Sequence, residues 1–154
     1  MKLITRDVDY AVKALLFISR NNNQRNTVTD LAQKLDVPYP FLRKIFRILS
    51  RQGILSSSKG KKGGFSLTKP PDKIRLTDLI RIFHGPVELA KCVFKDKVCP
   101  DIKTCPLRQK ILRLQALFLS ELQAVTIASL IEGDAKLARS QARPTKKNRL
   151  TAKI

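Results

Sequence analysis

Apolar residues recur at helical spacing along most of this chain of 154 residues. A repeat of about 3.6 residues gathers them on one face, which is typical of an amphipathic helix. The segments that show this repeat are residues 5–20, 29–35, 39–52, 77–83 and 106–130. The pattern therefore predicts a mainly α protein whose longest helix lies in the C-terminal part of the chain.

Residues at the ends of these segments favour helix boundaries. Thr27 or Thr29 is a suitable N-cap for the second segment and Thr77 for the fourth, because a threonine hydroxyl accepts a hydrogen bond from the first turn. Pro40 fits the first turn of the third helix, and Gly53 ends that helix. The face of this third helix that we predict to be buried consists of Phe41, Leu42, Ile45, Ile48 and Leu49.

Residues 54–57 and 65–68 are predicted β-strands that flank the sequence SKGKKGG, which is rich in glycine and lysine. Glycine allows positive φ angles and close approach of the backbone to another molecule. The order of helix, short helix, tight turn, helix and basic hairpin is that of a winged helix-turn-helix. We therefore predict this fold, with a small β-hairpin wing, for the first half of the chain.

Basic side chains are predicted on the surface that such a fold presents to DNA. The third helix would enter the major groove by its N-terminal end, where long side chains reach base edges or phosphates. The candidate DNA-binding residues are Tyr39, Arg43, Lys44 and Arg47 on the helix, with Lys59, Lys61 and Lys62 in the hairpin. Single basic residues are often only solvated, so the prediction depends on the combination of helix pair and basic wing.

Net charge narrows the class of partner. The chain has 31 Lys and Arg residues against 12 Asp and Glu residues, which gives a formal charge of +19. This excess indicates a polyanion, either nucleic acid or an anionic membrane. No apolar run approaches the length of a transmembrane helix, and the N-terminus lacks the features of a signal peptide. We expect a cytoplasmic protein that binds double-stranded DNA and no membrane.

The sequence has few of the residues and motifs that are typical of an enzyme. There is one histidine, no glycine-rich phosphate loop ahead of a helix, and no pair of carboxylates at a plausible site. We therefore expect neither catalysis nor a small-molecule substrate. A non-specific basic nucleic-acid-binding protein would share the charge. It would leave the wing and the cysteines unexplained.

Three cysteines lie close together, at Cys92, Cys99 and Cys105. In a reducing cytosol, clustered cysteines more often bind metal or sense redox state than stabilise a fold as disulfides. Thiolates are soft ligands that suit zinc or an iron–sulfur cluster, and three of them leave one ligand position to fill. The spacing alone leaves open a cluster, a zinc site, a thiol redox switch or structural cysteines.

Three stretches of the chain together resemble one family of regulators. They are TRDVDYAVKALLFIS, the segment from VTDLAQKLDVPYPFLRKIF through SSSKGKKGGFSLTKPP to HGPVEL, and CVFKDKVCPDIKTCPLR. Over about residues 2–130 they are similar to the winged-helix transcription regulators typified by the bacterial repressors IscR and NsrR. The resemblance implies a homodimer, formed through the long C-terminal helix, on a palindromic or half-palindromic operator. The helix residues that fit this role are Leu114, Leu117, Phe118 and Leu122, which could also pack within one chain.

The same resemblance implies that the three cysteines hold an iron–sulfur cluster, of the [2Fe-2S] or [4Fe-4S] type. Its fourth ligand differs between subgroups. In the IscR-like group it is a histidine at the position of Arg108, which cannot ligate. In the NsrR-like group it is an aspartate that corresponds to Asp9. The resemblance therefore favours Asp9 over Asp7 and His84, although an acid at a helix N-terminus also suits the helix dipole.

The wing departs from the family pattern at one position. Family wings often carry an arginine where this chain has Lys59. Lysine lacks the planar fork of arginine, so contact with phosphates is better supported than insertion into the minor groove. We interpret the chain as a repressor whose operator affinity is switched by the cluster. The same cysteines could instead serve a zinc-bound or thiol-based regulator.

Four segments follow from these observations. Residues 1–86 form the winged helix-turn-helix, 87–106 the cysteine-rich sensor loop, and 106–132 the dimerisation helix. Residues 133–154 form a basic tail with little apolar content, for which we predict disorder.

Overall fold

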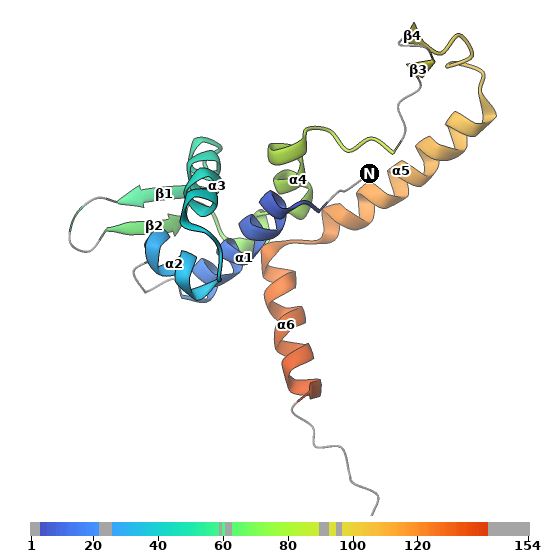
Figure 1. Cartoon of the computed structure of the whole chain (residues 1–154). Helices are drawn as coiled ribbons and strands as arrows, with labels where there is room; N and C mark the ends of the chain where they lie inside the picture. Colours follow the sequence, from blue (N-terminus) through green and yellow to red (C-terminus); the bar gives the residue numbers. More distant parts are fainter. Residues whose placement is uncertain are drawn as a thin grey trace, which may run out of the picture.

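The computed structural model describes residues 4–21, 26–58, 60, 63–89, 93–94 and 97–141; residues 93–94, 97–98 and 135–141 are described by backbone only. The N-terminal unit contains α1 (Arg6–Arg20), α2 (Val28–Lys34), α3 (Tyr39–Arg51), the hairpin β1 (Leu55–Ser58) and β2 (Gly64–Leu67), and α4 (Leu76–His84). A short 3₁₀ turn, η1 (Pro71–Lys73), precedes α4. The expected winged helix-turn-helix with a small hairpin is confirmed (Figure 1).

The core of this unit lies between α1, α3 and α4 and is closed by the hairpin. Its fully covered side chains include Leu15 and Ile18 of α1, Leu31 of α2 and Leu49 of α3. These residues sit at the helical spacing that the sequence shows, so each helix turns one apolar face inward. The remaining face of each helix stays in solvent.

Local hydrogen bonds fix both the start of α2 and the turn between α2 and α3. The Thr27 hydroxyl accepts from the Asp30 N–H at 3.1 Å, which makes Thr27, and not Thr29, the N-cap of α2. Asp36 adopts a positive φ of 51°, and Val37 N–H then donates to the Ala32 carbonyl at 3.0 Å. Val37 is buried beneath this turn, which fixes the direction in which α3 starts.

Two aromatic residues of α3, Phe41 and Phe46, differ from the predicted burial of this helix. Phe41 is 51% exposed, so the prediction that it is buried was wrong. Phe46, which was not in the predicted buried set, is covered and meets the Phe65 ring edge-on at a centroid distance of 4.8 Å. The hairpin packs against the Phe46 side of α3, and no described element covers Phe41 in the same way.

The hairpin docks closely on the segment ahead of α2. β1 pairs antiparallel with β2 in a register that aligns Leu55 with Leu67 and Ser58 with Gly64. Phe65 N–H donates to the Asn26 carbonyl at 2.9 Å. A Cβ at Gly64 would lie 3.1 Å from that carbonyl oxygen, so glycine permits this approach. The wing is therefore fixed to the helical core at its base.

The start of α4 also differs from the prediction. α4 begins at Leu76 with Arg75 as its N-cap, and Thr77 is a buried residue inside the helix, not its cap. Arg75 pairs with Thr126 in an isolated antiparallel bridge. This long-range pairing, which no local pattern encodes, sets the first residue of α4.

The single helix predicted over 106–130 is wrong, because the structure has two helices there. α5 (Pro106–Ala124) and α6 (Ile127–Gln141) point in different directions (Figure 1). Between them, the Val125 carbonyl accepts from Leu76 N–H at 2.9 Å, and Ile127 N–H donates to the Ile74 carbonyl at 3.0 Å. Thr126 and Ser129 then cap α6 through reciprocal backbone-to-hydroxyl hydrogen bonds.

α6 returns to the winged helix. Ile127 is fully buried in the core, and the Arg20 guanidinium at the end of α1 binds the Asp134 carboxylate at 2.6 Å. Because α6 continues to Gln141, the disorder predicted from residue 133 is contradicted as far as 141. The rest of the predicted tail, 142–154, lies outside the described residues. No helix of the described part of the chain is long and apolar enough to span a membrane.

Candidate nucleic-acid interface and cysteine loop

A groove of about 1080 Å³ is lined by α3 and by the hairpin that packs beside it. Its walls combine cationic and aromatic side chains with one serine of the strand. They include Tyr39, Arg43, Lys44, Arg47, Arg51 and Ser57. All four predicted helix residues, Tyr39, Arg43, Lys44 and Arg47, are solvent-exposed, and the structure brings all of them to this groove.

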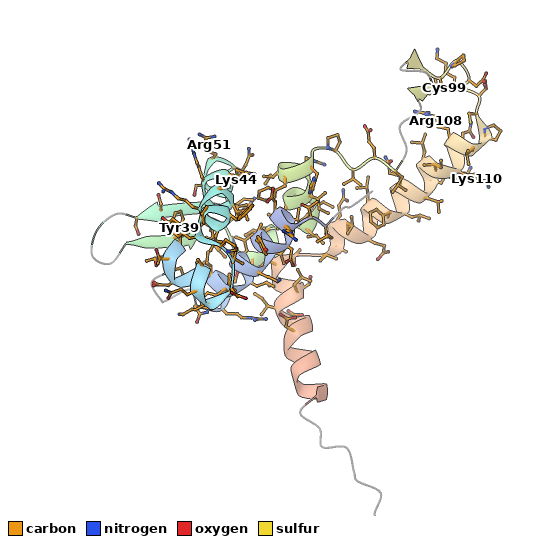
Figure 2. All side chains as sticks on the ribbon, in the orientation of Figure 1. Tyr39, Lys44, Arg51, Cys99, Arg108 and Lys110 are labelled. Atoms are coloured by element: carbon orange, nitrogen blue, oxygen red, sulfur yellow. The ribbon has the colours of Figure 1, made fainter. Side chains whose placement is uncertain are left out.

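Arg51 belongs to the same surface and was missed in the sequence (Figure 2). It follows Arg47 by one helical turn, and residues at this spacing share a face. That spacing could have identified it. No acidic residue occurs anywhere in α3, so its exposed face carries positive charge only.

The hairpin lysines Lys59, Lys61 and Lys62 lie outside the described residues. The strands that carry them are described up to Ser58 and from Gly63 onward. Gly63 N–H donates to the Gly60 carbonyl at 2.8 Å, which closes the turn. The three lysines are thus attached to a hairpin whose base borders the groove.

Two aspartates of the first turn of α1 are paired with lysines. The Asp7 carboxylate lies 3.7 Å from the Lys44 ammonium of α3, and the Asp9 carboxylate lies 2.8 Å from the Lys13 ammonium. The hydrogen bond that the Lys13 ammonium donates to Asp9, together with the negative charge of that carboxylate, raises the pKa of Lys13. Asp7 therefore competes for a cation of the candidate DNA surface, whereas Asp9 faces its own helix.

The cysteine loop lies at the far end of α5 from the winged helix (Figures 1 and 2). It contains the short strands β3 (Val93–Phe94) and β4 (Lys97–Val98). Cys99 and Cys105 are partly buried free thiols on the turn that follows, and Cys105 N–H donates to the Asp101 carbonyl at 2.9 Å. Cys105 is the N-cap of α5, with Pro106 next to it, so its sulfur sits at the positive end of a helix dipole. Cys92 lies outside the described residues.

The candidate fourth ligands are not near this loop within one chain. Asp7 and Asp9 start α1, which packs against α3, α4 and α6. His84 ends α4, and its Nε2 atom is 2.6 Å from the Thr5 hydroxyl. Among the residues that the structure describes, no three His, Cys, Asp or Glu side chains form a group able to hold a metal ion.

The apolar residues of α5 divide into two sets. None of its residues is buried, and Leu114 and Leu117 are 59% and 65% exposed. Phe118 and Leu122 are partly covered. The predicted dimerisation residues therefore include two that are free for a partner and two that are shielded in part within the chain.

Comparison with known proteins agrees with this architecture. The Rrf2 family, described as iron-dependent transcriptional regulators, matches residues 4–133. A relative from Aquifex aeolicus (strain VF5), named as an HTH-type transcriptional regulator, is 32% identical over 131 residues, which cover 84% of this chain and 91% of the relative. Protein aau3 of Rhizobium meliloti (strain 1021) is 27% identical over 130 residues, or 84% of each chain.

Solved structures share the fold. CymR of B. subtilis, titled the global cysteine regulator, superposes with a TM-score of 0.70 at 22% identity, covering 86% of this chain and 98% of CymR. IscR of T. potens superposes with a TM-score of 0.67 at 17% identity, covering 94% of this chain and 93% of IscR. The family match spans the winged helix, the cysteine loop and α5. This chain belongs to the Rrf2 family of DNA-binding transcriptional regulators.

Proposed function

We propose that this regulator is a homodimeric repressor whose affinity for a specific operator is switched by an iron–sulfur cluster held by Cys92, Cys99 and Cys105. The observation that carries the proposal is the position of Cys99 and Cys105. They are partly accessible thiols on one short turn, away from the core and ahead of a helix with unburied leucines. Thiols that served only packing would be expected among the buried side chains.

DNA would be held by the surface between α3 and the wing. The N-terminal end of α3 would enter the major groove, where Arg43, Lys44 and Arg47 can reach bases or phosphates. Arg51, further along the helix, suits a phosphate. The wing lysines Lys59, Lys61 and Lys62 would follow the neighbouring backbone, where a lysine acts as a point charge. The groove supports this arrangement because its charged walls are all cationic.

Dimerisation would cover the leucines of α5. A monomer that leaves Leu107, Leu114 and Leu117 between 59% and 67% exposed on one helix has an apolar surface that favours association. A second α5 supplies a matching apolar face, because a two-fold interface uses the same patch on both subunits. Phe118 and Leu122, which follow Leu114 by one and two helical turns and are partly covered, would extend this contact.

The donor set suits a cluster with one further ligand. Thiolates are the usual cluster ligands, and Arg108 on the first turn of α5 would place positive charge near a negatively charged cluster. Because α5 carries the loop away from its own α1, a ligating Asp9 would have to be Asp9 of the partner subunit. On binding the cluster, Asp9 would give up its exposed ion pair with Lys13. The loss of a pair at this spacing costs about 0.3–0.5 kcal/mol.

Regulation would follow from this connection. Asp9 belongs to the winged helix and the cysteines to the loop, so a bond between them across the dimer would set the angle between the two DNA-binding units. When bound, the cluster would supply a redox- and ligand-sensitive centre. Its loss would release the two winged helices from each other and change operator affinity.

The deciding measurement is anaerobic purification of the full chain, followed by a visible absorption spectrum and assays of iron and acid-labile sulfide. We expect a cluster band with near-stoichiometric iron and sulfide, and loss of both in Cys99→Ser and Cys105→Ser variants. Asp9→Ala should keep DNA binding but respond less to loss of the cluster. An Asp9→Ala protein with unchanged spectrum and unchanged switching would remove Asp9 from the ligand set.

A zinc or thiol-based switch is the second candidate. Cys105 is a partly accessible free thiol at the N-terminus of α5, and Cys99 lies on the turn just before it. In that case the purified protein would be colourless and would take up no cluster on reconstitution. Zinc content or a redox-dependent change in operator affinity would then identify the mechanism.

A further inference from the structure

Phe41 is an aromatic side chain on the exposed side of the DNA-reading helix. It is 51% exposed, although aromatic side chains gain more than most from burial. It lies in the first turn of α3, at the end that enters the major groove in helix-turn-helix proteins. Nothing in the fold of one chain explains why an apolar ring should stand at this position.

The residues around Phe41 favour a polyanion as the partner that covers the ring. Lys44 follows it by three residues and is its neighbour on the helix surface, and Arg43 and Arg47 carry further positive charge on the groove side of the same helix. α3 contains no acidic residue, although the Asp7 carboxylate of α1 lies 3.7 Å from the Lys44 ammonium. A protein-docking surface is usually depleted of charge at its centre, whereas this ring lies next to a cation at the start of a cationic helix. The unpaired leucines that suit a second copy of this chain lie on a different helix, α5.

One apolar group is available in the major groove of DNA. The 5-methyl group of thymine projects there, and apolar side chains, phenylalanine among them, contact it. Cytosine has only a hydrogen at the same ring position, and the purines carry no methyl group at this edge. An aromatic ring on the first turn of a recognition helix can therefore distinguish thymine from cytosine without a hydrogen bond.

We propose that Phe41 is a specificity-determining residue that reads the 5-methyl group of a thymine in each half of the operator. The inference rests on the DNA-binding function proposed above and deepens it. Arg43, Lys44 and Arg47 provide affinity and polar contacts, and Phe41 adds a preference for thymine at one position. The ring gains burial only when the duplex carries that methyl group.

The test compares thymine with deoxyuridine, which lacks only the 5-methyl group. Duplexes are first selected from a random pool with the full-length wild-type chain, and each thymine of the selected site is then replaced singly. Fluorescence anisotropy gives the Kd of each duplex. For the wild-type chain we expect one position per half-site where deoxyuridine weakens binding about fourfold, the effect of one buried methyl at ~0.8 kcal/mol.

The same series is measured with Phe41→Ala and with Ile4→Ala as the matched control. Ile4 is equally exposed, at 51%, and lies outside α3. Phe41→Ala should bind the thymine duplex more weakly and lose its sensitivity to deoxyuridine, whereas Ile4→Ala should keep the wild-type profile. The thermal midpoint and the molar mass from light scattering should be unchanged in both variants.

Three results would overturn the inference. Phe41→Ala with the wild-type pattern of deoxyuridine sensitivity would show that the ring does not contact a methyl group. A changed oligomeric state in Phe41→Ala would assign the ring to a protein partner. If the wild-type chain selects no sequence at all, the proposed operator function itself is wrong, and this outcome is distinct from the first two.

Discussion

The winged helix and the arm, which consists of α5 and the cysteine loop, differ in how far their apolar side chains are buried. Side chains of α1, α2, α3, α4 and β1 close a common core, to which α6 adds Ile127. α5 is 19 residues long and has no buried residue. One region is complete within a single chain, whereas the other leaves leucines that only a further surface can cover. The difference supports the proposal that α5 is the part of the molecule that associates with a second chain.

Charge differs between the two regions in its arrangement and not in its amount. Of the 31 Lys and Arg residues, 17 lie in residues 1–86 and 14 in residues 87–154, a similar share of each part, but the exposed face of α3 carries no acid. The arm instead carries the thiols and the exposed leucines. The cationic surface and the exposed thiols and leucines therefore lie in different parts of the chain. Three variants, or sets of variants, test this difference between the two regions.

The largest effect is expected in the core of the winged helix. Leu49 of α3 is fully buried among α1, α3 and the hairpin, so Leu49→Ala removes buried methyl groups and leaves a cavity. We expect the free energy of unfolding to fall by about 2–5 kcal/mol in urea titrations. Leu112→Ala on α5, where the leucine is 41% exposed, should change it by less than about 0.5 kcal/mol. Equal losses would show that the arm is as tightly packed as the core.

A second effect concerns assembly. The double variant Leu114→Glu with Leu117→Glu places two carboxylates in the proposed dimer contact, and each unpaired charge there costs several kcal/mol. We expect light scattering to show a monomer, with dimer dissociation raised about a hundredfold or more. Circular dichroism should still show a folded chain.

Leu112→Glu is the matched control for this variant. Leu112 is two residues from Leu114 and therefore points to the opposite side of α5, so the control should remain dimeric. A double variant that also stays dimeric would contradict the role of the α5 leucines.

The smallest effect tests the contact between the first turn of α1 and the DNA-reading helix. Asp7→Asn releases Lys44, which lies 3.7 Å from the carboxylate, to bind a phosphate. Exposed pairs are worth roughly 0.2–1 kcal/mol, so operator affinity should rise by at most about fivefold at low salt. The measurement is the Kd on a selected duplex over a series of salt concentrations.

Two further variants separate this pair from general repulsion of DNA. In a Lys44→Ala background the effect of Asp7→Asn should vanish, because the partner is gone. Asp36→Asn removes one exposed acid that is not paired with Lys44, and asparagine also tolerates the positive φ of 51° there. If Asp36→Asn raises affinity as much as Asp7→Asn, the ion pair has no separate effect.

Local pattern was sufficient for most of the winged helix. The bounds of α1, α2, α3 and both strands agree with the prediction within one or two residues, because apolar spacing, a threonine cap and glycine turns act over a few residues. The exposed cations of α3 followed from the same spacing. Arg51 was accessible to this reasoning too, since it lies one turn beyond Arg47.

Pattern was insufficient where distant segments meet. The local sequence around Phe41 and Phe46 does not show which of the two rings is buried. Phe46 is buried because the hairpin packs on its side of α3. The apolar repeat runs through Val125 and Ile127 without a break. Backbone bonds from Ile74 and Leu76 divide the segment into α5 and α6.

Short-range spacing and residue chemistry were enough to predict the winged helix, its basic third helix and the clustered thiols. The break in the helix at Thr126, the exposure of Phe41 and the distance of Asp9 from the cysteine loop of its own chain followed only from the folded structure. These outcomes depend on which surfaces meet after folding. A periodic pattern records that a residue is apolar, whereas the position of its neighbours in space sets whether it is covered.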